Sequence, residues 1–248
     1  YIQGSFKLQN INFLIEKNTL NAFVGPSGCG KSTIANLIMG FWDIENGQIN
    51  ISGKNISEYS EQSISKLIGS VQQEAILFNI SIFENIAIGK ENATKEEVIE
   101  AAKKARCHDF IEALPNKYDT KVGEMGVKLS GGEKQRISIA RMILKNAPIV
   151  ILDEATAFAD QENEEKMQRS ISALTKGKIL FVIAHRLSTI TNANQIIVLK
   201  NGEIHSVGTH KSLLGSDPLY RNMWEAHIGA RNWSANSKQE VKNTCSEL

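Results

Sequence analysis

Nine residues, GPSGCGKST at positions 25–33, have the composition and spacing of a loop that holds phosphate. They match the pattern GxxxxGK[ST] at every fixed position and stand between an apolar run, 20–24, and a stretch of helical character. Glycine lets the backbone wrap closely around phosphate oxygens, Lys31 is expected to reach the β- and γ-phosphates, and the Ser32 hydroxyl to bind Mg²⁺. A glycine-rich turn could match by accident, but the strand–loop–helix context favours a nucleoside triphosphate site. The predicted binding residues of this phosphate loop are Gly25, Pro26, Ser27, Gly28, Cys29, Gly30, Lys31, Ser32 and Thr33, with Cys29 as a small filler.

Two acids end a second apolar run, IVIL at 149–152. Adjacent residues at a strand end point in different directions, so one carboxylate can face a metal ion and the next the γ-phosphate. We therefore predict Asp153 as a Mg²⁺ ligand, direct or through water, and Glu154 as the general base for an attacking water. Two solvated acids are the alternative, which the four apolar residues before them disfavour. His185 ends a third apolar run, 179–184, and its position at a strand end makes it a candidate for the same site.

A second phosphate-binding pattern, LSGGEKQR, occupies positions 129–136. Ser130 and Glu133 fit the capping box S-x-x-E, which would only start a helix. Gly131 and Gly132 add bare backbone at that helix start, where N–H groups can bind an anion. The capping box alone does not need the glycine pair, so phosphate binding is the favoured interpretation, and both roles can hold together.

Composition and charge bound the class of protein. The 248 residues are 42% hydrophobic and 22% charged, with a net charge of +1, so nothing indicates a polyanion partner and no nucleic acid is expected. Three cysteines without a CxxC spacing argue against a disulfide framework or a zinc site. No apolar run approaches the ~18–20 residues of a membrane span, and the sequence begins at Tyr1. We expect a soluble piece of a longer chain.

The pattern of the chain predicts an α/β fold. Apolar or alternating runs at 6–15, 20–24, around 49–51, and at 68–73, 149–152, 179–184 and 195–200 predict strands, the last followed by a hairpin through Asn201 and Gly202. Between 74 and 146 the pattern is helical: a capping box at Thr94 and Glu97 precedes one helix over 96–114, and another runs from the LSGGE stretch to about Lys145. Strands alternating with helices imply a mostly parallel central sheet covered on both faces, with an inserted helical lobe and two short closing helices near His227.

Together these residues resemble the nucleotide-binding domain of ATP-binding cassette (ABC) transporters, from Tyr1 to about His227. LSGGEKQR is similar to the family's signature, and AHRLST around His185 to its switch-histidine segment. The resemblance further implies Gln73 as the Q-loop glutamine, Asp160 as the D-loop aspartate and Tyr1 as the aromatic residue stacked on adenine. Catalysis is then assigned to Glu154, His185 and Lys31, with ATP and Mg²⁺ as cofactors and Ser32, Gln73 and Asp153 as metal ligands.

The resemblance also implies an organisation. It predicts a P-loop NTPase domain over 1–228, with N-terminal antiparallel strands, a RecA-like core at 1–73 and 147–228, a helical subdomain at 74–146, and a disordered tail at 229–248. In this family two such domains, identical or different, pair head to tail. Each ATP then lies between the phosphate loop of one domain and the signature, here Ser130, Gly131 and Gly132, of the other.

Two segments resemble the exporter-type members of the family. TKVGEMG (120–126) and ILFNISIFENIAIG (76–89) are similar to exporter segments, which implies a permease, fused upstream, and a place on the cytoplasmic face of the inner membrane. One departure is the D-loop, AFAD at 157–160 instead of SALD, which removes a serine hydroxyl. That form and the MWEAH ending resemble exporter-fold transporters linked to siderophore and metal uptake.

Two other functions remain open at this point. A non-transport ABC ATPase acting on nucleic acid or ribosomes would usually carry coiled coils, tandem cassettes or basic extensions, and none is visible. A nucleotide sensor without turnover conflicts with Glu154 and His185. ATP-driven transport is the favoured interpretation.

Overall fold

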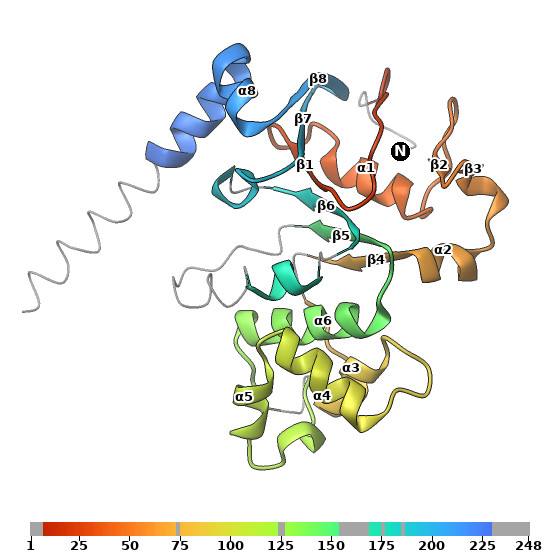
Figure 1. Cartoon of the computed structure of the whole chain (residues 1–248), viewed down its shortest axis with the longest axis vertical. Helices are drawn as coiled ribbons and strands as arrows, with labels where there is room; N and C mark the ends of the chain where they lie inside the picture. Colours follow the sequence, from red (N-terminus) through yellow and green to blue (C-terminus); the bar gives the residue numbers. More distant parts are fainter. Residues whose placement is uncertain are drawn as a thin grey trace, which may run out of the picture.

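A six-stranded sheet forms the centre of the computed structural model, in the order β4-β5-β6-β1-β7-β8 (Figure 1). Neighbouring strands from β4 to β7 run parallel, and β8 is antiparallel to β7. The strands are β1 Leu20–Val24, β4 Ile68–Val71, β5 Ile149–Asp153, β6 Ile179–Ile183, β7 Gln195–Lys200 and β8 Glu203–Gly208. The structure describes residues 7–72, 75–123, 127–153, 169–174, 177–184 and 187–229.

Both faces of the parallel strands are buried, which explains why their sequences are nearly continuous apolar runs. In β1, Phe23 points to the cluster that contains helix α1, Lys31–Ile38, while Ala22 and Val24 belong to the cluster of the helical lobe. On the α1 face, Phe23 stacks on Phe181 at a ring-centroid distance of 5.7 Å. One face thus packs against α1, and the other belongs to the core cluster that also contains residues of the helical lobe.

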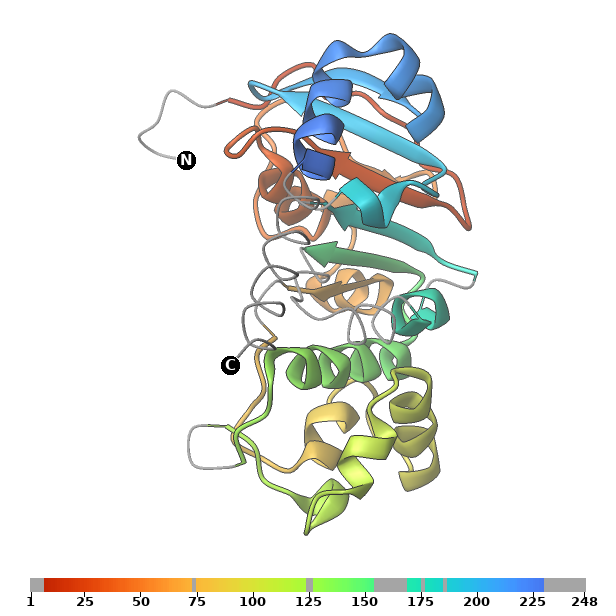
Figure 2. The ribbon, with the colours of Figure 1, turned by 90° about the vertical axis from the view of Figure 1, so that its left-hand side faces the viewer.

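The helical lobe lies beyond the β4 edge of the sheet (Figures 1 and 2). Its helices are α3 Ile82–Ala87, α4 Lys95–Lys104, α5 His108–Glu112 and α6 Gly131–Lys145. Capping boxes start α3, α4 and α6, so the two that the sequence predicts, at Thr94 and Ser130, are confirmed. The remaining described elements are β2 Asn50–Ile51, β3 Lys54–Asn55, α2 Glu61–Leu67, helical residues at 169–174, α8 His210–Ser216, a helix over 218–229, and 3-10 turns at Ile56–Glu58, Lys117–Asp119 and Leu187–Ile190.

Two sequence predictions of local structure are wrong. Residues 7–15 form no strand, although Leu8, Ile11, Phe13 and Ile15 pack against the core and the Gln9 N–H donates to Gly202 O at 3.0 Å. Their alternation is interrupted once, by a step of three between Leu8 and Ile11, where Asn10 has a left-handed φ of 55°. The apolar side chains are thus partly buried without a regular ladder of backbone hydrogen bonds. The antiparallel pair in the N-terminal part is β2 with β3.

The helix predicted over 96–114 is two helices, α4 and α5. Arg106 has φ 56°, a left-handed conformation that ends α4 before Cys107 begins the next helix. Among the described residues, no helix is both long and apolar enough to span a lipid bilayer.

Candidate functional site

The phosphate loop follows β1 directly and ends where α1 begins. A Cβ atom on Gly25 would lie 2.2 Å from the Leu199 carbonyl oxygen, and the φ of Gly25 is 150°, so the position requires glycine. Gly30 caps α1 in the left-handed region with φ 107°. These glycines let the chain turn sharply from the strand into the helix, so that the first N–H groups of α1 face the loop.

Lys31 lies inside the loop and is only 6% exposed. Its Nζ donates to Gly25 O at 2.9 Å and to Pro26 O at 3.0 Å, and it lies 3.7 Å from the Cys29 sulfur. The buried cation is therefore held by the carbonyls of the loop that it would serve. Cys29 is a buried, free thiol against Gly25, which fits the predicted role of filler.

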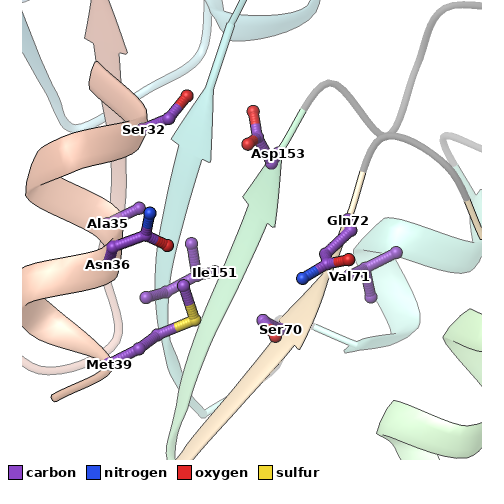
Figure 3. Close-up of a pocket in the computed structure, with 9 residues that line it drawn as sticks. All are labelled: Ser32, Ala35, Asn36, Met39, Ser70, Val71, Gln72, Ile151 and Asp153. Atoms are coloured by element: carbon purple, nitrogen blue, oxygen red, sulfur yellow. The ribbon is translucent and has the colours of Figure 1, made fainter. Parts of the chain in front are cut away.

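A cleft of about 290 Å³ opens beside α1, between that helix and the ends of β4 and β5 (Figure 3). Ser32 and Asp153, the two described residues predicted as metal ligands, both line it and point toward the same end in Figure 3. The rest of the lining comprises Ala35, Asn36, Met39, Ser70, Val71, Gln72 and Ile151. A hydroxyl and a carboxylate oxygen are hard ligands of the kind that Mg²⁺ accepts.

These two groups fit the metal in number as well as in type. The described part of the chain has no cluster of three or more His, Cys, Asp or Glu side chains able to hold a metal ion. Mg²⁺ in nucleotide sites is usually bound by one or two protein ligands, with the phosphates and water completing its shell. The pair Ser32 and Asp153 therefore suits a magnesium ion that arrives with a nucleotide.

The signature lies elsewhere, at the start of α6. Ser130 is the N-cap: its Oγ accepts from the Glu133 N–H at 3.3 Å, and the Ser130 N–H and Oγ–H both donate to Glu133 Oε2 at 2.8 Å. Ser130 and Gly131 are exposed, whereas Gly132 is buried. None of the three is among the described residues that line the cleft of Ser32. The chain thus presents its two phosphate-binding patterns at separate places.

Several predicted site residues lie outside the described part of the chain: Tyr1, Gln73, Glu154, Asp160 and His185. Three of their neighbours are described. Gln72 lines the cleft, Asp153 ends β5, and Ala184 directly follows β6. The predictions for Gln73, Glu154 and His185 therefore concern positions that adjoin the carboxyl ends of three adjacent parallel strands.

Sequence reasoning missed part of the cleft wall. Asn36 and Met39 line it from α1, and Ser70 and Gln72 from the end of β4. The α1 residues carry a signal, since positions 32, 35, 36 and 39 share one helix face at spacings of three and four. The β4 residues carry none, because their neighbour β5 is distant in the sequence.

Comparison with known proteins agrees with these motifs. Residues 8–157 match the family described as ABC transporter. The chain is 52% identical over 217 residues to the "Putative multidrug export ATP-binding/permease protein" of Staphylococcus aureus strain NCTC 8325 / PS 47, and 51% identical to the protein of that name in the bovine strain RF122. Each match covers 88% of this chain and 38% of the relative.

A solved structure is similar as well. The "Structure of a bacterial Atm1-family ABC exporter with ATP bound" superposes with a TM-score of 0.83 and 44% sequence identity over 88% of this chain. The match covers 38% of that exporter chain, so the present chain spans well under half the length of the proteins that it matches. The predicted fold class is confirmed.

Proposed function

We propose, because the chain belongs to the ABC transporter family, that it is the ATPase domain of an ABC exporter. In this role it binds and hydrolyses Mg·ATP and so drives a permease that moves a substrate across a membrane. The observation that carries the proposal is the cleft that both Ser32 and Asp153 line, beside the loop that encloses Lys31. The alternative, an ABC ATPase acting on nucleic acid or ribosomes, has no such support, since the relatives named above are exporters.

Each group has a role in hydrolysis. The backbone of residues 25–33 and the Lys31 ammonium would bind the β- and γ-phosphates, while Ser32 and Asp153, with Gln73, would hold the metal. Mg²⁺, when bound, neutralises charge on the phosphates. Glu154 accepts the proton of the water that attacks the γ-phosphorus, and the bond to the β-phosphate oxygen breaks to leave ADP. By the family resemblance, His185 would act as the switch histidine, Asp160 as the D-loop aspartate, and Tyr1 would stack on adenine.

A second ABC ATPase domain completes the site. Ser130 and Gly131 are exposed on α6 and do not line their own chain's cleft, which supports their use on the nucleotide of a partner domain placed head to tail. A charge-assisted hydrogen bond from such donors to phosphate is stronger than one between neutral groups. Two ATP molecules would then join two domains, and hydrolysis would release them.

The permease is the second partner. The chain exposes apolar side chains on both sides of α3, with Ile76 63%, Phe78 52% and Ile88 51% exposed. Single exposed apolar residues are common, but three around one short helix are suited to a protein contact. We propose that the permease docks here, which would place the chain on the cytoplasmic face of the membrane. The core at 1–73 and 147–228 would bind the nucleotide, and the lobe at 74–146 would carry the movement.

The proposal is tested with Glu154→Gln, which keeps the shape of the side chain and removes the base. With Mg·ATP the variant should bind nucleotide as the wild type does, release no phosphate, and accumulate as a dimer that contains intact ATP. Glu225→Gln, an exposed site on the last helix, is the matched control and should behave as the wild type. A Glu154→Gln protein that turns over ATP at the wild-type rate would show that another group is the base.

A further inference from the structure

The segment 76–82 follows the cleft residue Gln72, forms a single β-bridge from Ser81 to Lys121 and enters α3 at Ile82. Asn85 of α3 is fully buried and pairs with Phe78 on both sides: its Oδ1 accepts from the Phe78 N–H at 2.9 Å, and its Nδ2 donates to Phe78 O at 3.0 Å. The same Nδ2 also donates to Ser81 O at 3.0 Å. One side-chain amide therefore satisfies the backbone N–H and carbonyl of Phe78 and the carbonyl of Ser81.

Arg141 of α6 hydrogen-bonds both to Asn85 and to the same segment. Its Nε donates to Asn85 O at 2.8 Å, its Nη2 to Asn85 Oδ1 at 3.1 Å, and both Nη atoms lie 3.4 Å from Ile76 O. The guanidinium also lies over the Phe78 ring at 5.7 Å. Burial lowers the pKa of Arg141, but a guanidinium stays charged, so its hydrogen bonds to these carbonyls are charge-assisted.

The end of α3 packs directly against the backbone of α6 at Arg141. A Cβ atom on Gly89, just past α3, would lie 2.3 Å from Arg141 O. The two backbones therefore touch next to the guanidinium, and any displacement of α3 must displace α6.

The segment is also joined to the chain that leads into the signature. The Ile82 N–H donates to Thr120 O at 3.0 Å, and the Val122 N–H donates to Ile80 O at 3.1 Å. Segment 76–82 thus contacts both the approach to the signature and the helix that follows it. Ser130 is eleven residues before Arg141, about 16 Å along α6 at 1.5 Å per residue, within a single helix of 15 residues once the cap is passed.

We propose that Asn85 and Arg141 are positioning residues that make segment 76–82, residues 120–122 and α6 one rigid unit. A displacement of the cleft wall at Gln72, four residues before Ile76, is then passed to Ser130 and Gly131. Each chain thereby links the nucleotide in its own cleft to the phosphate that it offers to a partner's nucleotide. This inference rests on the proposed function, because it concerns the coupling between two ATP sites.

The main test is Arg141→Met, which keeps the length and apolar stem of the side chain and removes every donor. Lys145→Met is the matched control: Lys145 is one turn further along α6, is also partly desolvated, and donates to Ile68 O at 3.0 Å, at the start of β4 rather than in segment 76–82. ATP binding is measured with a fluorescent ATP analogue, hydrolysis by phosphate release over a range of ATP concentrations, and stability by thermal unfolding.

Arg141→Met should bind the analogue with an affinity within about twofold of the wild type. Its kcat should fall about tenfold or more, which is within the usual range of coupling between sites. Its hydrolysis should also no longer depend cooperatively on the ATP concentration. Both variants should unfold at a similar temperature, lower than that of the wild type, but Lys145→Met should keep cooperative hydrolysis. Equal kinetics in the two variants would overturn the proposal, since both would then act only through the stability of α6.

A second measurement applies if Arg141→Met does not fold. In the wild type, Mg·ATP should slow amide hydrogen exchange both at residues 25–33 and at 127–135; in the milder Arg141→Lys, only at 25–33. Wild-type protection of both regions in Arg141→Lys would refute the coupling. The same data separate the two hypotheses: no protection at 25–33 in the wild type contradicts the proposed function, whereas protection there without any change at 127–135 contradicts this inference alone.

Discussion

Replacement of Ser130 by alanine separates the two roles that its position allows. The Ser130 Oγ caps α6 by accepting from the Glu133 N–H at 3.3 Å, and its proton is directed to Glu133 Oε2 at 2.8 Å. A hydroxyl has one donor, so binding to a partner's phosphate requires that proton to turn away from Glu133 while the capping bond is kept. The alanine variant loses the cap in every case and the phosphate donor only if our proposal is right.

The chain contains a matched control for the cap. Thr94 starts α4 with the same kind of capping box, and its Oγ1 accepts from the Glu97 N–H at the same 3.3 Å. Both residues are exposed. Each alanine variant should lose about 1 kcal/mol of stability, the usual cost of an N-cap. For a domain stable by about 5–15 kcal/mol, this loss leaves the folded fraction essentially complete, so unfolding cannot lower activity.

The phosphate donor has a larger effect on catalysis. A hydrogen bond to a charged group contributes about 1.5–3 kcal/mol, which is roughly a ten- to hundredfold change in kcat/KM for Ser130→Ala. Thr94→Ala should stay within about twofold of the wild type, because surface substitutions away from a site change little beyond stability. Urea unfolding gives the stability of both variants, and phosphate release gives kcat/KM. If Ser130→Ala loses stability like Thr94→Ala and hydrolyses ATP at the wild-type rate, Ser130 is a cap and nothing more.

Three further predictions concern the loop and the acid stability of the fold. Lys31→Ala removes the buried cation and should weaken ATP binding about tenfold or more, measured by nucleotide titration. Gly25→Ala places a Cβ 2.2 Å from Leu199 O, so it should cost about 1–3 kcal/mol in urea unfolding and lower ATP affinity; an unchanged midpoint would contradict the steric argument. Burial alone would raise the pKa of Asp217, but hydrogen bonds from Ser206 and two backbone N–H groups outweigh it and lower the pKa. The stability from Asp217 is thus present above about pH 4 and lost as the pH falls through its lowered pKa, so Ser206→Ala should move acid unfolding, followed by circular dichroism, to higher pH.

The elements predicted best from the sequence are those whose signals are local. The runs at 20–24, 149–152 and 195–200 are apolar because both faces of a parallel sheet are buried, and each forms a strand. Capping boxes at Thr94 and Ser130 place the starts of α4 and α6 because the side-chain and backbone partners are three residues apart. The phosphate loop is equally local, since its glycines and Lys31 act within nine residues.

Both errors concern backbone conformation and hydrogen bonding, which the pattern of apolar residues does not report. Residues 7–15 partly bury alternate apolar side chains as an edge strand would, but periodicity cannot report whether their backbone groups pair. The break between α4 and α5 falls at Arg106, in a left-handed conformation that glycine or asparagine usually marks. Arginine is not a residue type that marks a helix end. The helical period of apolar residues therefore continues through Arg106 in the sequence, although the helix itself does not.

The strand order carries the part of the site that no local pattern contains. Because β4 pairs with β5, the polar residues Ser70 and Gln72 and the acid Asp153 line one cleft, and Gln72 lies four residues before the segment held by Asn85 and Arg141. A sequence can place Ser130 at a helix start, but the packing of α6 on α3 and on β4 is what connects that helix with the strand that ends at the cleft. The same contacts that stabilise the lobe therefore limit how the cleft can move, and a coupling between the two phosphate sites needs no hinge of its own within the lobe.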